Sequence, residues 1–221
     1  ECGTIEGFGE LDGGIGLEVV PYATAGVARD RAAGERGFHF DPDAGGDVYY
    51  RLTPSMTLAT TFLTDFAETE NDERQINLNR FPLFFPEKRD FFLEGAGHYT
   101  FGAPRAARTL VLPFFSRRIG LHEDGTKVPL LAGVKLTGES GPFEVGLLGV
   151  ATDATATTDE ESLAVARVKY AIDTATTVGM IATGGDPTSS GENQVAGVDF
   201  HHRVPKFIGD LDLRIALDAV T

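Results

Sequence analysis

Apolar and polar residues alternate with a period of two along much of this chain. The clearest run is 210–219, DLDLRIALDA, in which every odd-numbered position is apolar and the even-numbered positions carry three aspartates and one arginine. Residues 162–172 and 195–202 follow the same pattern. Successive side chains of a β-strand point to opposite faces, so the pattern predicts strands that separate an apolar surrounding from a polar one.

The pattern along the whole chain predicts strands joined by alternating short and long connections. The predicted strands are 15–28, 46–53, 56–64, 109–119, 129–138, 142–152, 162–172, 176–184, 195–202 and 210–219. Turn-forming residues at 53–55, 138–141 and 173–175 predict tight turns. Longer polar connectors are predicted at 29–45, 65–75, 120–127, 153–161 and 185–194. Helical periodicity is absent, apart from one possible short turn at 68–76.

Two architectures accommodate many antiparallel strands: a soluble β-sandwich or barrel, and a transmembrane β-barrel. Several strands have about ten residues, the length that a tilted strand needs to cross a bilayer. Tight turns alternate with long loops, and the polar faces carry full charges, as a wet barrel interior permits. A soluble sheet with one solvated face would produce the same alternation. We predict an all-β, antiparallel outer-membrane-type β-barrel or barrel segment, in preference to the sandwich.

Several longer motifs resemble one known family. They are INLNRFPLFFPEKRDFFLEGAGHYTFG at 76–102, PFFSRRIGL at 113–121, PLLAGVKLTGESGPFEVGLL at 129–148, and the upstream run YRLTPSMTLATTFLTDFAETENDERQINL at 50–78. Together they resemble the domain-of-unknown-function family 5916, over most of residues 10–203. The resemblance implies an outer-membrane-type barrel region of Gram-negative bacteria, which commonly follows a module similar to carbohydrate-binding family nine. Some members carry the label of membrane-associated hydrolase.

Members of this family are usually longer than 221 residues. The resemblance therefore implies one barrel-like domain over 1–221 that is a fragment, or a shortened relative, of a longer chain. It also implies that further barrel strands or another subunit complete the sheet.

The stretch FPLFFPEKRDFFLEGAGHYTFG, residues 81–102, surrounds a compact charged cluster with seven aromatic residues. Pro82 and Pro86 exclude a regular central strand there. In a barrel, outward rings would contact lipid and inward charges would pair inside the lumen. We predict that 81–102 is an inward-folded loop that forms a constriction or plug.

The candidate site residues belong to this loop and to the PFFSRR segment. The charged cluster is Glu87, Lys88, Arg89, Asp90, Glu94, Arg117 and Arg118, and the aromatic motif is Phe84, Phe85, Phe91, Phe92, Phe114 and Phe115. The four charges at 87–90 sum to zero and can neutralise one another. Arg117 and Arg118 are alternative partners for the nearby carboxylates, because arginine and carboxylate form bidentate pairs.

The bulk composition narrows the choice of partners. The net charge of −14 argues against nucleic acid and against an anionic inner leaflet. The single cysteine excludes an internal disulfide. Neither a signal peptide nor an apolar run long enough for a transmembrane helix is expected.

Other candidate chemistry is weak. Adjacent His201 and His202 point to opposite faces of a strand, so only His201 shares a face with Asp199, and a structural role is favoured over a metal site. The acidic run 65–73 lacks the pattern of a calcium loop. Gly-rich phosphate loops and Gly-x-Ser-x-Gly elbows are absent from the sequence. We therefore expect no metal and no cofactor, and the residues give the hydrolase label no support.

These observations predict a protein of the bacterial outer membrane that contacts lipid and binds or passes a solute. A saccharide is one candidate for that solute. A membrane-associated glycan hydrolase and a soluble β-sandwich binding domain are the alternatives.

Overall fold

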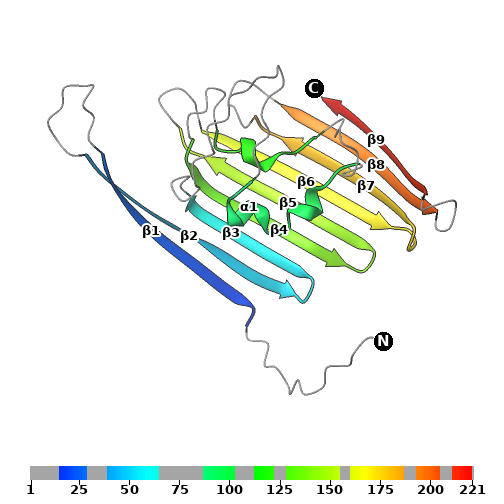
Figure 1. Ribbon diagram of the computed structural model, residues 1–221, viewed down its shortest axis with the longest axis horizontal. Coiled ribbons are helices and arrows are strands. Elements are labelled where there is room, and N and C mark those ends of the chain that lie inside the picture. Colours follow the sequence, from blue (N-terminus) through cyan, green and yellow to red (C-terminus); the bar gives the residue numbers. More distant parts are fainter. Residues whose placement is uncertain are drawn as a thin grey trace.

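One antiparallel sheet dominates the computed structural model, which describes residues 15–28, 39–64, 87–102, 112–121, 128–154, 160–186, 193–204 and 211–220. Within these residues nine strands pair in chain order (Figure 1). The strands are β1 (Leu17–Ala28), β2 (His39–Thr53), β3 (Met56–Thr64), β4 (Leu130–Ser140), β5 (Phe143–Thr152), β6 (Glu161–Ala171), β7 (Thr176–Gly184), β8 (Gln194–Val204) and β9 (Leu211–Val220). The prediction of an all-β, antiparallel fold is confirmed.

The sheet is open. Among the described residues β1 pairs only with β2, and β9 pairs only with β8. The ends of β1 and β2 run beyond β3 as a two-stranded arm (Figure 1), because β3 pairs with β2 only from Gly46 onward.

Short and long connections leave the sheet at opposite ends. The β2–β3, β4–β5 and β6–β7 connections are short turns at 54–55, 141–142 and 172–175. The β3–β4 connection is by far the longest, and we call residues 87–102 and 112–121 within it the insert. It holds α1 (Asp90–Leu93) and the 3-10 helices η2 (Ala96–Tyr99) and η3 (Ser116–Arg118). Among the described residues, no helix has the length and apolar character needed to cross a membrane.

The insert lies across one face of the sheet, which we call the insert face (Figure 1). Apolar side chains from both sides fill the contact. The insert contributes Phe91, Phe92, Tyr99, Phe101 and Ile119, and the neighbouring strand residues are Ala59, Leu130, Leu148, Val150, Leu163, Val165 and Ile181.

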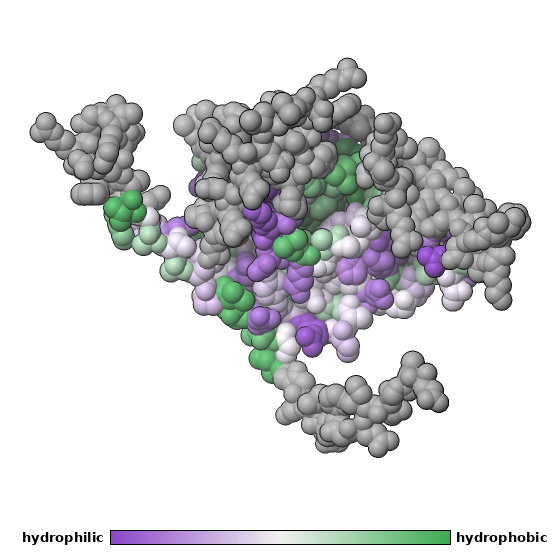
Figure 2. All heavy atoms as spheres, viewed as in Figure 1, coloured by the Kyte–Doolittle hydropathy of each residue, from purple (hydrophilic) through white to green (hydrophobic). Residues whose placement is uncertain are grey.

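The two faces of the sheet differ in polarity. Register partners share a face, so the pairing assigns each strand residue to the insert face or to the opposite face. The charged residues of β1 to β8 whose side chains are described all lie on the insert face: Glu18, Asp43, Asp47, Arg51, Lys135, Glu139, Glu144, Glu161, Arg167, Lys169, Asp199 and Arg203. Hydrophilic side chains accordingly gather on this side of the sheet in Figure 2.

The opposite face carries apolar side chains that no described residue covers. Its exposed members include Leu17, Val19, Tyr50, Phe62, Val134, Phe143, Leu147, Tyr170, Val178, Met180 and Val198. Met180 is 58% exposed, whereas Arg167 and Lys135 on the insert face are 1% and 2% exposed. These three positions show the reverse of the usual distribution, because the two cations are buried and the large apolar side chain is exposed.

One predicted strand and one predicted connector are wrong. The strand predicted at 109–119 is not a strand over residues 112–119, where Pro113 lacks a backbone donor and η3 follows. Phe114 and Ile119 both pack at the core although they are five residues apart, whereas residues on the same face of a strand are an even number apart. The connector predicted at 29–45 is also too long, because β2 begins at His39. Pairing with β1 holds its Pro, Asp and Gly residues in an extended conformation despite their low strand propensity.

Candidate functional site

Glu87 and Arg89 form a bidentate ion pair inside the charged cluster. Nε and Nη2 of Arg89 donate to Oε1 and Oε2 of Glu87 over 2.8 and 2.7 Å. The Arg89 side chain is nearly inaccessible to solvent. Burial by itself raises the pKa of the Glu87 carboxyl, but the hydrogen bonds and positive charge of Arg89 outweigh it and hold this pKa below its ordinary value.

Arg89 also joins the two segments of the insert. Its Nη1 donates to the carbonyl oxygen of Ile119 at 2.9 Å, and its Nη2 donates to that of Ser116 at 2.8 Å. The guanidinium lies 4.1 Å from the centre of the Phe92 ring. One buried arginine therefore fixes residues 87–93 against residues 116–119.

Lys135 of β4 fixes α1 to the sheet. Its Nζ donates to the carbonyl oxygens of Phe91 and Glu94, the latter at 2.5 Å. Nζ also lies 4.9 Å from the centre of the Phe91 ring. Carbonyl groups at the end of a helix lack intrahelical partners, and a cation satisfies them well.

Glycines in the strands leave space for the aromatic side chains of the insert. A Cβ at Gly133 would lie 3.1 Å from the Phe91 ring, and a Cβ at Gly146 would lie 3.1 Å from the Tyr99 ring. The Tyr99 hydroxyl donates to the carbonyl oxygen of Leu147 at 2.9 Å. Burial raises the pKa of this hydroxyl, which keeps it protonated and able to donate.

A second ion pair holds the part of the insert that lies near the short turns of the sheet. Arg167 of β6 and Asp199 of β8 approach to 2.7 Å. Arg167 Nε donates to the carbonyl oxygen of Thr100, and the Gly102 amide donates to Asp199. Between them on β7 lies Gly179, where a Cβ would sit 2.5 Å from Nη1 of Arg167 and closer still to Asp199. The pair therefore rests directly on the backbone of β7.

Glu144 and Lys169 extend this network. Lys169 Nζ lies 2.7 Å from Oε1 of Glu144, and the same oxygen lies 3.0 Å from Nδ1 of His98. Lys169 also reaches Oγ1 of Thr100 at 3.3 Å. The returning part of the insert, residues 97–102, is thus tied to β5, β6 and β8.

A polar pocket of about 230 Å³ opens beside this second network. Strands β5 to β8 line it with Glu144, Arg167, Lys169, Thr177, Asp199 and His201. The insert contributes Thr100 and Gly102. Strand wall and insert therefore share one cavity at the short-turn end of the sheet.

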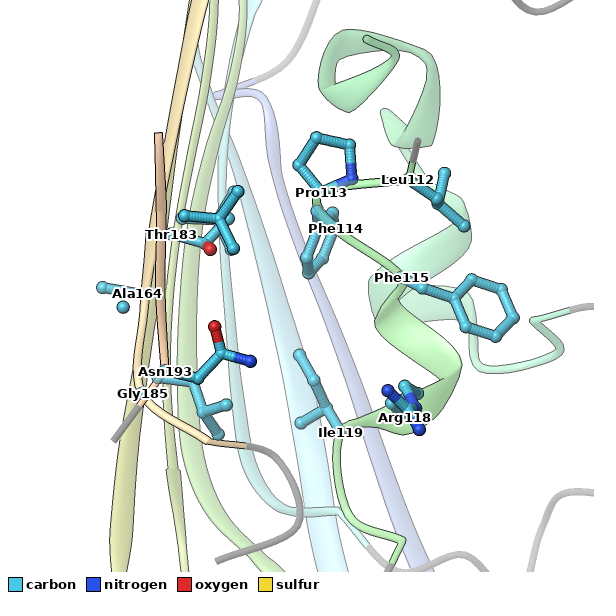
Figure 3. A pocket seen from close by; sticks show the side chains of 14 residues that line it. Leu112, Pro113, Phe114, Phe115, Arg118, Ile119, Ala164, Thr183, Gly185 and Asn193 are labelled. Atoms are coloured by element: carbon cyan, nitrogen blue, oxygen red, sulfur yellow. The ribbon is translucent and has the colours of Figure 1, made fainter. Parts of the chain in front are cut away.

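A second pocket, of about 250 Å³, separates residues 112–119 from β6, β7 and β8 (Figure 3). In Figure 3 Phe114 and Ile119 lie toward the sheet, opposite Thr183, whereas Phe115 points away from it. Its lining is mainly apolar, and its polar side chains include Arg118, Thr183 and Asn193.

The predicted site residues are only partly brought together. Glu87 and Arg89 pair, while Asp90, Glu94 and Arg118 are exposed and Lys88 is half-buried. Arg117 is buried.

The aromatic motif divides in a similar way. Phe91 and Phe92 are buried and meet edge to face at 5.0 Å. Phe114 packs on Tyr99 at 5.3 Å, and Phe115 is half-buried. Phe84 and Phe85 lie outside the described residues, as do Pro82, Pro86, His122 and the acidic run 65–73.

The sequence did not identify Lys135, Glu144 and the Arg167–Asp199 pair as parts of one site. Each of these residues is a charged residue at the polar position of an alternating strand. This pattern predicts the face of the sheet on which the side chain lies, but it does not predict which residue the side chain contacts. The register confirms that His201 shares a face with Asp199. Within the described residues, no group of three or more His, Cys, Asp or Glu side chains is arranged to hold a metal ion.

Comparison with curated proteins and with solved structures finds no match. A family model described as Domain of unknown function (DUF5916) matches residues 14–177, well over half of the chain. The chain therefore belongs to this family of unknown function, as its motifs predicted.

Proposed function

We propose that this chain forms the wall of an outer-membrane β-barrel whose interior binds or passes a polar solute. One observation carries the proposal. The face opposite the insert is apolar and is covered by none of the described residues, while the described strand charges lie on the insert face. A transmembrane barrel requires this distribution, with apolar side chains toward lipid and polar ones toward the interior.

Exposing the apolar side chains of the opposite face to water would cost more free energy than exposing them to lipid. Exposed apolar patches on soluble monomers rarely exceed a few hundred Å². Here such side chains extend from Leu17 on β1 to Val198 on β8. A soluble sandwich would need a second layer over this face, and the described residues supply none.

Strand length is consistent with a bilayer. The strands have nine to fifteen residues, and a tilted strand needs about 9–11 to span the hydrocarbon core.

The two open edges then need partners. Backbone N–H and C=O groups in hydrocarbon must be hydrogen-bonded, which is why membrane sheets close into barrels. The outer edges of β1 and β9 are unpaired among the described residues. Further strands, from a longer chain or from another subunit, would complete the barrel.

In this proposal the insert narrows the interior. Arg89, Lys135 and Arg167 brace it through backbone carbonyl oxygens, so its path across the wall is fixed. The solute would pass or bind beside it. A saccharide is one candidate solute.

Detergent dependence tests the proposal directly. The purified chain should be monodisperse only in detergent, show heat-modifiable gel migration and float with liposomes after reconstitution. Conductance of the reconstituted protein then distinguishes passage of a solute from binding alone. A chain that remains a monodisperse monomer without detergent would show that the opposite face is covered by protein, and the membrane proposal would fall.

A further inference from the structure

The polar pocket beside the Arg167–Asp199 pair differs from the predicted charged cluster at 87–90. We propose that it is a binding site for an uncharged polyhydroxylated molecule of the size of one sugar ring. The inference rests on the proposed function, because it takes the insert face as the interior that a solute reaches.

The charges of the pocket are already neutralised in pairs. Arg167 meets Asp199 at 2.7 Å, and Lys169 meets Glu144 at 2.7 Å. An anionic ligand would have to displace a carboxylate from a cation, and a cationic ligand would have to displace a cation from a carboxylate. Breaking a largely buried pair leaves an uncompensated charge, which is costly. An uncharged polar ligand avoids this cost.

The remaining groups suit hydroxyls. Thr177 lines the pocket with a hydroxyl group and His201 lines it with an imidazole. The Thr100 hydroxyl donates to the carbonyl oxygen of Gly97 at 2.8 Å and accepts from Lys169 Nζ at 3.3 Å, which leaves one of its two lone pairs for a ligand hydroxyl. A hydroxyl both donates and accepts hydrogen bonds, so it can bind either type of group. A ligand with several hydroxyls can therefore contact the strand wall and the insert together.

The volume favours a small ligand. The cavity holds about 230 Å³, below the roughly 300–1,000 Å³ of sites for drug-sized ligands. A single sugar ring is a better match to this volume than a long oligosaccharide.

The test uses the full chain in a detergent without a sugar head group, because a maltoside detergent would compete for the site. Glucose, glucosamine and glucuronate are compared as neutral, cationic and anionic probes of one ring size, by saturation-transfer NMR and by titration calorimetry. Glucose should bind more tightly than either charged probe. Tighter binding of glucuronate or glucosamine, or binding of none of the three, would overturn the inference.

Matched variants locate the site. Thr177→Val removes a hydroxyl from the pocket while keeping the side-chain shape, and should weaken glucose binding about threefold to tenfold. Thr57→Val makes the same change on the insert face of β3, outside the pocket, and should leave affinity unchanged. Equal affinities of the two variants would show that glucose binds elsewhere.

The two proposals fail separately. If the chain inserts into liposomes but binds no neutral sugar, the barrel proposal stands and this inference is wrong. If the chain is soluble without detergent and Thr177→Val still weakens glucose binding, the pocket is a sugar site on a soluble protein and the membrane proposal is wrong.

Discussion

At the scale of single residues, buried cations hold the insert by its backbone. Arg89 donates to the carbonyl oxygens of Ser116 and Ile119, Lys135 to those of Phe91 and Glu94, and Arg167 to that of Thr100. Backbone carbonyls are present whatever the side chain is. These contacts therefore fix the path of the insert, while its exposed side chains can vary.

Arg89→Ala should strongly destabilise the folded chain. It leaves Glu87 buried without its bidentate partner, and removing one member of a buried pair typically costs about 3–5 kcal/mol. Arg118→Ala is the matched control, because Arg118 is exposed in the same insert, and it should change stability by less than about 0.5 kcal/mol. Urea unfolding of the reconstituted proteins measures both. Equal midpoints for the two variants would contradict the bracing role of Arg89.

Gly179→Ala should disturb the Arg167–Asp199 pair. The added methyl would lie 2.5 Å from Nη1 of Arg167, and overpacking of this kind costs about 1–3 kcal/mol. Gly184→Ala, on the same strand, adds its methyl where nothing lies within 4 Å. A Gly179→Ala protein as stable as the Gly184→Ala protein would show that the pair can move off β7 at no cost.

Acid should weaken the insert through Glu87. Its pKa is held below the ordinary carboxyl value of 4.5 in the fold, so the unfolded chain binds its proton first as the pH falls. The stabilisation is complete above that ordinary value and is lost as the pH falls through the lower folded value. Between pH 7 and pH 3 the wild type should therefore lose more stability than Glu87→Gln. Identical losses in the two proteins would exclude Glu87 as a contributor.

At the scale of elements, period-two alternation located the strands well. The predicted 56–64 and 176–184 coincide with β3 and β7. Alternation failed at 112–119, where Pro113 and a 3-10 turn interrupt the chain, and at 39–45, where pairing with β1 overrides poor local propensity. A local sequence pattern does not show whether a neighbouring strand can pair with the segment and hold it in an extended conformation.

Single tryptophans test which face contacts lipid, because the chain has no tryptophan of its own. Met180→Trp lies on the opposite face of β7, and Thr177→Trp lies on the insert face of the same strand. Brominated lipids should quench the fluorescence of the first strongly and that of the second weakly, since quenching requires contact. Equal quenching, or stronger quenching of the second, would contradict the proposed orientation of the wall.

At the scale of the whole molecule, the open edges of the sheet should be its weakest part. Amides that face outward on β1 lack a partner among the described residues, whereas β5 pairs on both sides. Hydrogen exchange of the isolated chain in detergent should therefore be faster on β1 than on β5. Equally slow exchange on both strands would mean that another strand or a second copy already covers the edge of β1.

The sequence alone determined the all-β, antiparallel class, the apolar and polar faces of the strands, and the family. Alternation and motifs are local properties, so they can be recognised without knowing which residues are in contact. The sequence also indicated that the four charges at 87–90 can neutralise one another, and the structure shows that Glu87 pairs with Arg89. Only the tertiary structure decided that Arg167 meets Asp199, that Lys135 holds α1, and that strand glycines receive Phe91 and Tyr99. Each of these contacts joins residues far apart in the chain. Strand register and the path of the insert bring them together, and no local pattern encodes either.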